Sequence, residues 1–406
     1  MKMLVLLTSA FPYDNGEEFL SEELKYISGF DRVLICPCNL KKDSKITKKL
    51  PKSISCKPLR RKPAEKYAYA KLLAKPYVLG EIASLIQTGR FSTVKVHELL
   101  FFLRNANEIY ESLLSVKEIG KASKVTIYSY WFYDAAAAGI LLARTLRKRG
   151  IKVTQVSRAH GFDVHEERSE HGYLPMRRFL LSHVDRLYPC SLNGVETIAN
   201  RFPEFSHKIE TSFLGTCDCG EKKGSRSPVF HLVSCSYMVA VKRLHLIVEV
   251  LRQVDFPVLW THIGSGPLEK EMKDMAKQLP GIVQTEFLGQ TEHDAIMRYY
   301  QNNDITAFVN VSSSEGIPVS VMEACSFGIP VVATDVGGTG EAVFDGENGY
   351  LLPADFQPEV LVEKLRVLQS MPQEEYDRLC SGARASWMTK FNAAVNYRRF
   401  YEEISR

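Results

Sequence analysis

The segment at residues 305–341 constrains the fold more than any other part of the chain. Residues 305–311 are β-branched and apolar, which is the pattern of a strand buried in a parallel sheet. A polar loop follows, and Pro318 suits the first turn of a helix, because its fixed φ is helical and its missing N–H would have no partner there. Gly328 is typical of the left-handed residue that ends a helix. A second strand begins at Val331. The order strand, loop, short helix and strand predicts half of a nucleotide-binding α/β unit.

Two glutamates in this segment indicate what the unit binds. Glu315 lies in the loop and Glu323 on the predicted helix, with seven residues between them. A helix start has free backbone N–H groups and a partial positive charge, so the amides after Glu315 can hold a diphosphate. A carboxylate beside such a site can accept hydrogen bonds from sugar hydroxyls. The alternative interpretation is a surface helix with two solvated glutamates.

With its glycines and prolines, the segment resembles the Glu-x7-Glu signature of retaining glycosyltransferases of family four, the glycosyl transferases group 1. The resemblance implies an α/β chain with the GT-B fold: two Rossmann-like domains facing each other across a cleft, with a C-terminal helix crossing back. It also implies that Glu315 contacts the donor sugar and that Glu323 contacts the nucleotide ribose. The residues that would form the donor loop are Gly316, Ile317, Pro318 and Val319.

Residues 234–244 resemble the donor-phosphate site of the same family. In that family a lysine neutralises the diphosphate, and an arginine usually stands six residues before it. Lys242 fits the lysine, but Ser236 occupies the arginine position. Arg243 is the candidate for the second charge, although adjacent residues point in different directions on a helix.

Glycines after two further predicted strands complete the donor side. Gly264 and Gly266 follow a strand at 258–263, and they resemble the family's Gly-x-Gly loop near the nucleotide. Gly289 ends the next strand, where the family's backbone contacts the base. A Gly-x-Gly alone is a weak signal. A dehydrogenase is disfavoured, because no Gly-x-Gly-x-x-Gly follows a strand with an acid about 20 residues further on.

The first half of the chain carries fewer signals. A strand at residues 4–9 runs into a loop with Gly16, whose lack of a side chain would let the backbone approach a ligand closely. The resemblance implies that this loop closes over the donor phosphates and the acceptor. A lone glycine in a loop is also often only a turn.

His160 follows a predicted strand at residues 153–159. Ligands of open α/β sheets bind where strands end. The resemblance implies that His160 hydrogen-bonds the donor sugar or its phosphate as the leaving group departs. A structural histidine is the alternative. Arg158 and Asp163 are weaker candidates for the acceptor side, with Asp163 as the partner of an acceptor hydroxyl.

The chain has 406 residues, which is enough for two domains, each with its own core. We expect an acceptor-side domain at 1–215 and a donor-binding domain at 228–385. The residues between them, 216–227, are polar, contain glycine and carry charges of both signs, as an interdomain linker does. A C-terminal helix at about 386–406 is expected to return to the first domain.

Positive charge is concentrated at residues 41–66, although the net charge of the chain is only +5. Such a segment suits an anionic partner, such as a membrane surface or a pyrophosphate-linked acceptor. A solvated basic loop is equally compatible with it. The helical, apolar pattern at 64–114 could add a membrane-facing surface, but such stripes usually belong to the core. Nucleic acid is not an expected partner.

Cysteine usage suggests a reducing compartment, and the apolar runs are too short for a membrane span. Nine cysteines are too many by one for complete internal pairing. The pairs Cys36/Cys38 and Cys217/Cys219 are spaced more closely than structural zinc ligands usually are, so we expect free thiols and no metal. No apolar run reaches the roughly 18 residues of a membrane span. We expect a cytoplasmic protein, with peripheral binding at the inner face of the membrane as a hypothesis.

Together these features predict an enzyme that moves a sugar, with retention, from a UDP- or GDP-linked donor to a glycan or polyprenyl-pyrophosphate-linked acceptor. The strand spacing resembles bacterial polysaccharide-assembly enzymes, which favours capsule, O-antigen or exopolysaccharide synthesis. No cofactor is expected, because Lys242 and the amides after Glu315 would stabilise the departing diphosphate. Two alternatives remain: a GT-B sugar-nucleotide epimerase, and a non-catalytic module that binds nucleotide sugars.

Overall fold

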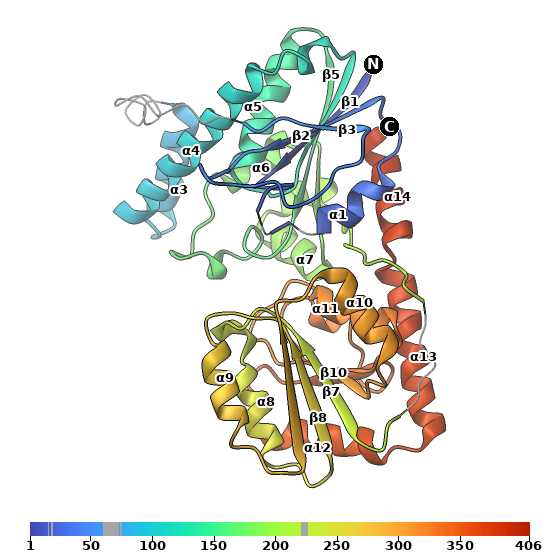
Figure 1. Cartoon of the computed structure of the whole chain (residues 1–406). Helices are drawn as coiled ribbons and strands as arrows, with labels where there is room; N and C mark the ends of the chain where they lie inside the picture. Colours follow the sequence, from blue (N-terminus) through green and yellow to red (C-terminus); the bar gives the residue numbers. More distant parts are fainter. Residues whose placement is uncertain (15, 18, 60–72, 74, 221–225) are drawn as a thin grey trace. The chain divides into compact units, whose positions relative to one another are not determined.

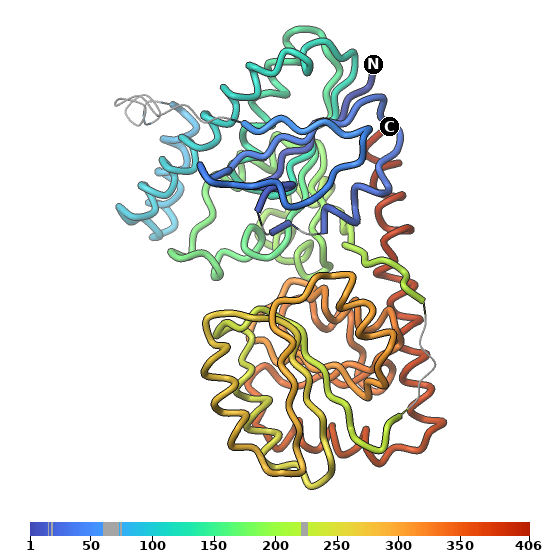
Figure 2. Tube along the Cα trace, in the orientation of Figure 1, coloured from blue at the N-terminus to red at the C-terminus, as the bar shows by residue number. Residues whose placement is uncertain are grey.

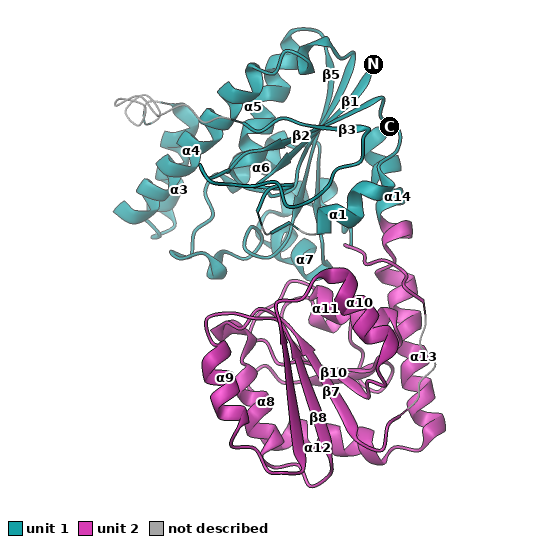
Figure 3. Cartoon of the chain, in the orientation of Figure 1, with its two compact units in different colours: residues 1–213, 397–406 teal, residues 214–396 magenta. Residues whose placement is uncertain are grey.

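The computed structural model describes residues 1–14, 16–17, 19–59, 73, 75–220 and 226–406. The chain divides into two compact units, coloured separately in Figure 3: unit 1 is Met1–Phe213 with Tyr397–Arg406, and unit 2 is Leu214–Asn396. The expected domain change at residue 215 lies next to the observed one. Within the expected linker 216–227, residues 221–225 lie outside the described residues, as do residues 60–66 of the basic segment.

Unit 1 is built on a parallel, six-stranded sheet of order β3-β2-β1-β4-β5-β6 (Figure 1). Its central strands are runs of apolar residues because helices cover both faces of such a sheet. The strand order is that of a dinucleotide-binding fold. The strands are β1 Lys2–Thr8, β2 Arg32–Pro37, β3 Ile54–Cys56, β4 Lys124–Ser129, β5 Lys152–Ala159 and β6 Arg186–Pro189.

The helices of unit 1 connect these strands. Ser191 caps the start of α7, because its side chain accepts a hydrogen bond from the Gly194 amide. The α-helices are α1 Phe19–Glu23, α3 Pro76–Gln87, α4 Thr93–Leu114, α5 Asp134–Lys148, α6 Arg177–His183 and α7 Leu192–Arg201. The 3-10 turns are η1 Leu24–Tyr26, η2 Ile119–Lys121, η3 Glu166–Arg168 and η4 Pro203–Lys208.

Unit 2 repeats this design with a parallel sheet of order β12-β11-β10-β7-β8-β9. Counted from β7, its order is the same as that of unit 1. The strands are β7 Phe230–Cys235, β8 Val258–Ile263, β9 Val283–Gly289, β10 Ala307–Asn310, β11 Val331–Thr334 and β12 Gly349–Leu352. The helices are α8 Leu244–Leu251, α9 Glu269–Ala276, α10 His293–Asn302, α11 Val319–Ser326, α12 Pro358–Ser370, α13 Gln373–Lys390 and α14 Ala393–Ser405, with 3-10 turns η5 Ala240–Lys242 and η6 Thr339–Glu341.

The segment predicted as strand, loop, helix and strand is confirmed as β10, α11 and β11. Gly328 has a φ of 72°, in the left-handed region predicted for it. Two local expectations are wrong. Pro318 precedes the helix with an extended ψ of 122° and does not lie in its first turn. Strand β3 lies inside the basic segment expected to be a loop, because its three residues pair with β2.

The last helix, α14, begins in unit 2, and from Tyr397 onward its residues belong to unit 1. Within unit 1 the Thr126 hydroxyl donates to the Ile404 carbonyl (3.1 Å), and the Tyr188 hydroxyl donates to Glu403 (2.6 Å). The end of the chain is therefore part of the unit 1 core. None of the helices among the described residues combines the length and the apolar composition that a membrane span needs.

Each sheet has one place where neighbouring strands lead their connections to opposite faces, which we call the switch point. In unit 1 it lies between β1 and β4, and in unit 2 between β7 and β10. Figure 2 shows the path of the chain through each unit. Ligands of open α/β sheets bind outside the carboxyl ends of the strands at this point. The loops after these four strands are therefore where each unit offers a site.

Candidate active site

Lys242 and Glu315 come from the two loops of the unit 2 switch point. Lys242 ends the turn η5 after β7, and Glu315 follows β10. The Lys242 Nζ lies 2.6 Å from the Glu315 Oε1, and the two side chains are 23% and 10% exposed. Asn310, at the end of β10, donates to the same oxygen at 3.2 Å. The structure thus brings together two residues predicted from separate motifs, as a partly buried ion pair that a ligand can reach.

Arg243 takes a different direction. It has a left-handed φ of 48°, so its side chain turns away from that of Lys242. Its guanidinium donates to the carbonyls of Val311 (2.7 Å), Ser312 (3.2 Å) and Ala354 (2.7 Å). These bonds fix the loop after β10, so the structure gives Arg243 a positioning role. It does not take the place of the arginine missing at Ser236.

The predicted donor loop leads into α11. The Gly316 carbonyl accepts a hydrogen bond from the Gly338 amide at 2.7 Å, and Ile317 is buried. Pro318 caps the helix, and Val319 is its first residue. The first N–H groups of an α-helix have no acceptor within the helix. This start is therefore a place where an anion can be held, next to Glu315 in the chain.

Gly264 and Gly266 leave room for the backbone of the loop after β7. A Cβ on Gly264, at a φ of 136°, would lie 2.0 Å from the Ser236 carbonyl oxygen. A Cβ on Gly266 would lie 2.6 Å from the Met238 carbonyl oxygen. The Gly264 amide also donates to the Gly289 carbonyl at 2.9 Å. These glycines are required for packing, and a direct contact with a nucleotide stays a prediction.

Glu323 is held from the neighbouring helix. Its side chain, on α11, is 8% exposed, and its Oε1 lies 2.8 Å from the Nε2 of His293 at the start of α10. Because a carboxylate only accepts, the His293 Nε2 is the donor in this pair. The histidine was not predicted. An acid with one oxygen fixed in this way retains acceptor capacity for a hydroxyl pair such as that of a ribose.

His160 follows β5 in unit 1 and lies against two aromatic rings. Its ring centre is 4.6 Å from that of Tyr130 and 4.6 Å from that of Trp131. Both ring nitrogens are buried, and within the described part of the chain neither has a hydrogen-bond partner. Burial, assisted by the charge of Arg158, lowers the pKa of His160 to about 3. The imidazole is therefore neutral at pH 7, with two buried nitrogens whose hydrogen-bonding capacity is unused among the described residues.

The low pKa predicts how the stability of unit 1 depends on pH. An unfolded histidine gains its proton near pH 6.5, whereas folded His160 stays neutral down to about pH 3. Stability from His160 is thus fully present above pH 6.5 and is lost as the pH falls. Relative to His160→Phe, wild type should lose about 1.4 kcal/mol per pH unit below pH 6.5.

Urea unfolding at pH 7.5, 6.0 and 5.0 measures this difference. His207→Phe, at an exposed histidine of the same unit, controls for the loss of an imidazole. If wild type and His160→Phe lose stability in parallel on acidification, His160 is not the buried neutral group that the structure shows.

The acceptor role expected for Asp163 is wrong. Its side chain is fully buried, and it accepts hydrogen bonds from the amides of Phe132 (2.8 Å) and His160 (2.7 Å). Burial raises the pKa of this carboxyl, although both amides oppose the shift. Asp163 therefore ties the loop after β4 to the loop after β5 and positions His160.

Arg158 is also not an acceptor residue, because it is fully buried in the unit 1 core. It donates to the Tyr128 hydroxyl (2.8 Å) and the Ser212 carbonyl (2.6 Å), and its guanidinium lies 4.3 Å from the ring centre of Phe400. Its charge partner is Glu23, 3.7 Å away and equally buried. Strand alternation explains the error: Arg158 points into the sheet face that the C-terminal helix covers.

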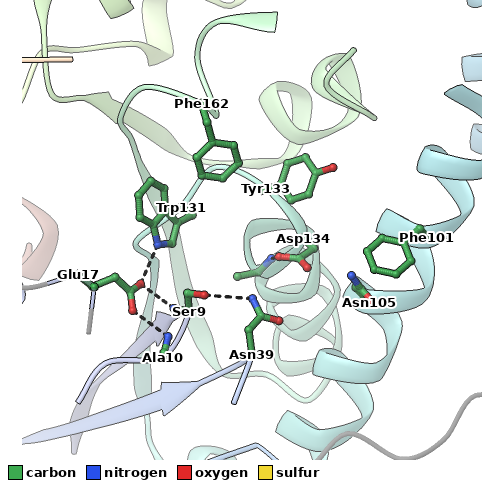
Figure 4. Close-up of a pocket in the computed structure, with 12 residues that line it drawn as sticks. Ser9, Ala10, Glu17, Asn39, Phe101, Asn105, Trp131, Tyr133, Asp134 and Phe162 are labelled. Carbon is green, nitrogen blue, oxygen red and sulfur yellow. Dashed lines mark hydrogen bonds between the residues drawn. The ribbon is translucent and has the colours of Figure 1, made fainter. Parts of the chain in front are cut away.

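Instead, the unit 1 switch point presents a cavity of about 560 Å³ (Figure 4). It lies between the loop after β1, the loop after β4 and helix α4. Gly16 lines it as an open turn, since it has a φ of 124° and a Cβ added there would meet no atom within 4 Å. The described lining residues are Ser9, Ala10, Gly16, Glu17, Asn39, Phe101, Asn105, Trp131, Tyr133, Asp134, Ala135 and Phe162.

Glu17 closes one side of this cavity and was not predicted. Its two carboxylate oxygens accept from the backbone amides of Ser9 (2.6 Å), Ala10 (2.8 Å) and Phe11 (2.8 Å), and from the Trp131 indole (2.7 Å). These amides form a concave donor set of the kind that binds anions. In the sequence, Glu17 is visible only as an acid after the first strand. Only the folded loop shows that its carboxylate accepts hydrogen bonds from the amides of Ser9, Ala10 and Phe11.

The described cysteines contribute no site of this kind. Cys36 and Cys38 are buried on and after β2, where burial raises the pKa of Cys36. The sulfurs of Cys217 and Cys219 lie 3.1 Å apart as free thiols. Among the residues that the structure describes, His, Cys, Asp and Glu form no group of three that could hold a metal ion.

Comparison with known proteins identifies the second unit. Residues 221–386 match the model of the family glycosyl transferases group 1. The D-rhamnosyltransferase WbpZ of Pseudomonas aeruginosa is 25% identical over 54% of this chain and 59% of its own length. The putative colanic acid biosynthesis glycosyltransferase WcaL of Escherichia coli is 24% identical over 64% of this chain and 66% of its own length. The chain thus matches less than two thirds of either relative.

Solved structures extend the likeness to the whole fold. The lipopolysaccharide outer core galactosyltransferase WaaB superposes with a TM-score of 0.69 at 16% identity, covering 100% of this chain and 99% of its own. Anabaena HepE in complex with UDP gives a TM-score of 0.65 at 15% identity, covering 100% of both chains. The chain therefore has the GT-B fold of these glycosyltransferases, and most of its second unit, residues 221–386, matches the glycosyl transferases group 1 model.

Proposed function

We propose that this chain, with a glycosyl transferases group 1 domain on a GT-B scaffold, is a retaining glycosyltransferase. It would move a sugar from a nucleotide-diphosphate sugar to a glycan or lipid-linked acceptor. The observation that carries the proposal is the Lys242–Glu315 pair at the switch point of unit 2, 2.6 Å apart and partly exposed. An ammonium and a carboxylate held together suit a ligand with a diphosphate next to a sugar.

In this proposal the protein chiefly stabilises the leaving group. The bond between the anomeric carbon and the diphosphate oxygen breaks, and the acceptor oxygen bonds to the same face of that carbon. The departing phosphate oxygen takes the proton of the acceptor hydroxyl. The transition state is oxocarbenium-like. Lys242 and the first amides of α11 balance the charge that develops on the diphosphate.

The other residues would orient the donor. Glu315 would accept hydrogen bonds from hydroxyls of the transferred sugar, and Glu323, fixed by His293, from the ribose. Neutral His160 would donate or accept one hydrogen bond, since its pKa of about 3 rules it out as a general acid near pH 7. Because Lys242 and the amides supply the positive charge, we propose that transfer needs no metal and continues in EDTA.

The relatives support a more specific setting. Their names refer to D-rhamnosyl transfer, colanic acid and, for AmsK of Erwinia amylovora, amylovoran. We therefore propose that the reaction belongs to the synthesis of a cell-surface polysaccharide, and a cytoplasmic location stays a prediction. Contact of residues 41–66 with an anionic membrane stays a prediction, which sedimentation with anionic vesicles would test.

A panel of UDP- and GDP-sugars tests the donor. One of them should raise the unfolding temperature, since a ligand at a hundred times its dissociation constant adds about 2.7 kcal/mol of stability. NMR of the transfer product should then show the anomeric configuration of the donor. Consumption of the donor without any acceptor, giving an epimer, would favour an epimerase. Binding without turnover would favour a non-catalytic module. If no nucleotide sugar shifts the unfolding temperature, the transferase, the epimerase and the binding module are all contradicted.

A further inference from the structure

The cavity at the unit 1 switch point has an aromatic wall. Trp131 and Phe162 lie with ring centres 5.1 Å apart, and Tyr133 meets Phe162 edge-on at 5.9 Å. The hydrogen bond from the Trp131 indole to Glu17 fixes the indole plane. Phe162 is 44% exposed, so its ring is open to a ligand. Figure 4 shows these rings along one side of the cavity.

The side of the cavity formed by α4 and α5 carries polar groups beside the Phe101 ring. Asp134 begins α5, and Asn105 lies on α4 with its side chain directed towards the cavity (Figure 4). The two residues are only 8% and 5% exposed, so their polar groups are fixed by the surrounding helices. Asn39, just after β2, donates a hydrogen bond of 3.4 Å to the Ser9 hydroxyl. The cavity therefore offers hydrogen-bonding groups facing an aromatic wall.

The charge of the cavity is negative. Glu17 and Asp134 are acids, and none of the described lining residues is Lys, Arg or His. The backbone amides that could have bound an anion, those of Ser9, Ala10 and Phe11, donate to Glu17 instead. With its four hydrogen bonds, this carboxylate uses its acceptor sites and blocks the amides. A phosphate in the cavity would meet like charge and no cation among these lining residues.

We infer that this cavity is the subsite for a sugar ring of the acceptor, and that it takes a neutral or amino sugar and rejects a phosphorylated group. The inference rests on the proposed function, which it deepens by naming the acceptor class. One face of a sugar ring consists of C–H groups, which pack against an aromatic ring by dispersion and apolar burial. Its hydroxyls need polar partners once water is displaced. At about 560 Å³ the cavity is within the range of small-ligand sites.

This assignment separates two parts of a lipid-linked acceptor. A polyprenyl pyrophosphate cannot place its diphosphate in the cavity, because the amides after β1 that could bind it are occupied by Glu17. The sugar that receives the new bond can occupy it. Specificity for the acceptor would then come from which ring hydroxyls reach Asp134 and Asn105.

Trp131 supplies a direct readout. The chain has three tryptophans, and the other two, Trp260 and Trp387, are 0% exposed. Acrylamide quenching of fluorescence should therefore report mainly on Trp131. The probes are the methyl glycosides of glucose, galactose, N-acetylglucosamine and glucosamine, with glucose 6-phosphate as the charged match of glucose.

We expect at least one methyl glycoside to protect Trp131, with glucose 6-phosphate at least tenfold weaker than unphosphorylated glucoside. Phe162→Ala should weaken protection at least tenfold, and Phe162→Tyr should restore it. Phe91→Ala, at an exposed phenylalanine outside the cavity lining, is the matched control and should bind as wild type does. Circular dichroism melting of Phe162→Ala checks the fold, and we expect the wild-type unfolding temperature because the Phe162 side chain is exposed.

Two results would overturn the inference: protection by none of the glycosides, or protection by glucose 6-phosphate as strong as by methyl glucoside. The variant Asp134→Asn tests the rejection of phosphate further. Because it removes one negative charge, the affinities of methyl glucoside and glucose 6-phosphate should differ less than in wild type. Donor binding is measured separately by thermal shift with UDP- and GDP-sugars. If glycosides protect Trp131 while no donor binds, the proposed function fails and the sugar subsite stands. If a donor binds while no glycoside protects Trp131, the proposed function stands and only the sugar subsite fails.

Discussion

Replacement of Lys242 by alanine is expected to lower kcat for sugar transfer by about 10²–10³-fold, the usual cost of removing one group that stabilises developing charge. The ammonium lies 2.6 Å from Glu315 and is the cation that the β7 loop directs into the switch point, since Arg243 is engaged by three carbonyls. No other described residue of that loop replaces it, because Ser236 stands at the position where the family usually has an arginine. Initial rates with a saturating donor measure the effect.

The matched control is Lys270→Ala, at an exposed lysine on α9 of the same unit. It should retain wild-type kcat. The Lys242→Ala protein should keep the wild-type unfolding temperature, because the lost pair is only partly buried and partly exposed pairs contribute little to stability. Full activity in Lys242→Ala would remove the observation on which the proposed function depends.

Replacement of Arg158 by methionine is expected to lower the free energy of unfolding of unit 1 by about 3–5 kcal/mol. The change leaves the Glu23 carboxylate buried without its cation, at a site where both side chains are fully enclosed. Burial already raises the pKa of Glu23, against the opposing effects of Arg158 and of the Tyr128 and Tyr401 hydroxyls. For a unit of this size, the loss corresponds to a decrease of roughly 6–20 °C in Tm.

Urea and thermal unfolding of the full chain measure this loss. The double variant Glu23→Leu with Arg158→Met should be more stable than Arg158→Met alone, because it removes the uncompensated charge. Arg149→Met, at an exposed arginine of the same unit, should change stability by no more than about 0.5 kcal/mol. If Arg158→Met has normal stability but a raised KM for the acceptor, Arg158 contacts the acceptor after all, despite its burial.

The strands, helix and loops that carry Lys242 and Glu315 could be predicted from the sequence because their signals are local. Strand ends, the helix start after Pro318 and the left-handed Gly328 depend on neighbours in the chain. Lys242 and Glu315 meet although 73 residues separate them, because both follow strands that end at the same edge of a parallel sheet. Arg243 was placed less well, since a single left-handed residue reverses the direction of its side chain.

The roles of Arg158 and Asp163 in unit 1 were predicted poorly, because the contacts that decide them are made with residues distant in the sequence. Asp163 and Arg158 lie next to His160 in the sequence, but both are directed into the core. The cavity that does open at this switch point combines residues from the loop after β1, the loop after β4 and helix α4. No local pattern marks such a set, since its members share no periodicity.

By itself the sequence determined the two α/β units, the ends of most strands and the two loops, after β7 and β10, that carry Lys242 and Glu315. Apolar runs and turn residues are sufficient for that, because they specify burial and chain direction locally. Only the tertiary structure decided that Glu17 occupies the amides after β1, that His160 is neutral and that Arg158 belongs to the core. Each of these depends on which groups face one another once water is excluded, and the Glu17–Trp131 bond joins residues 114 positions apart.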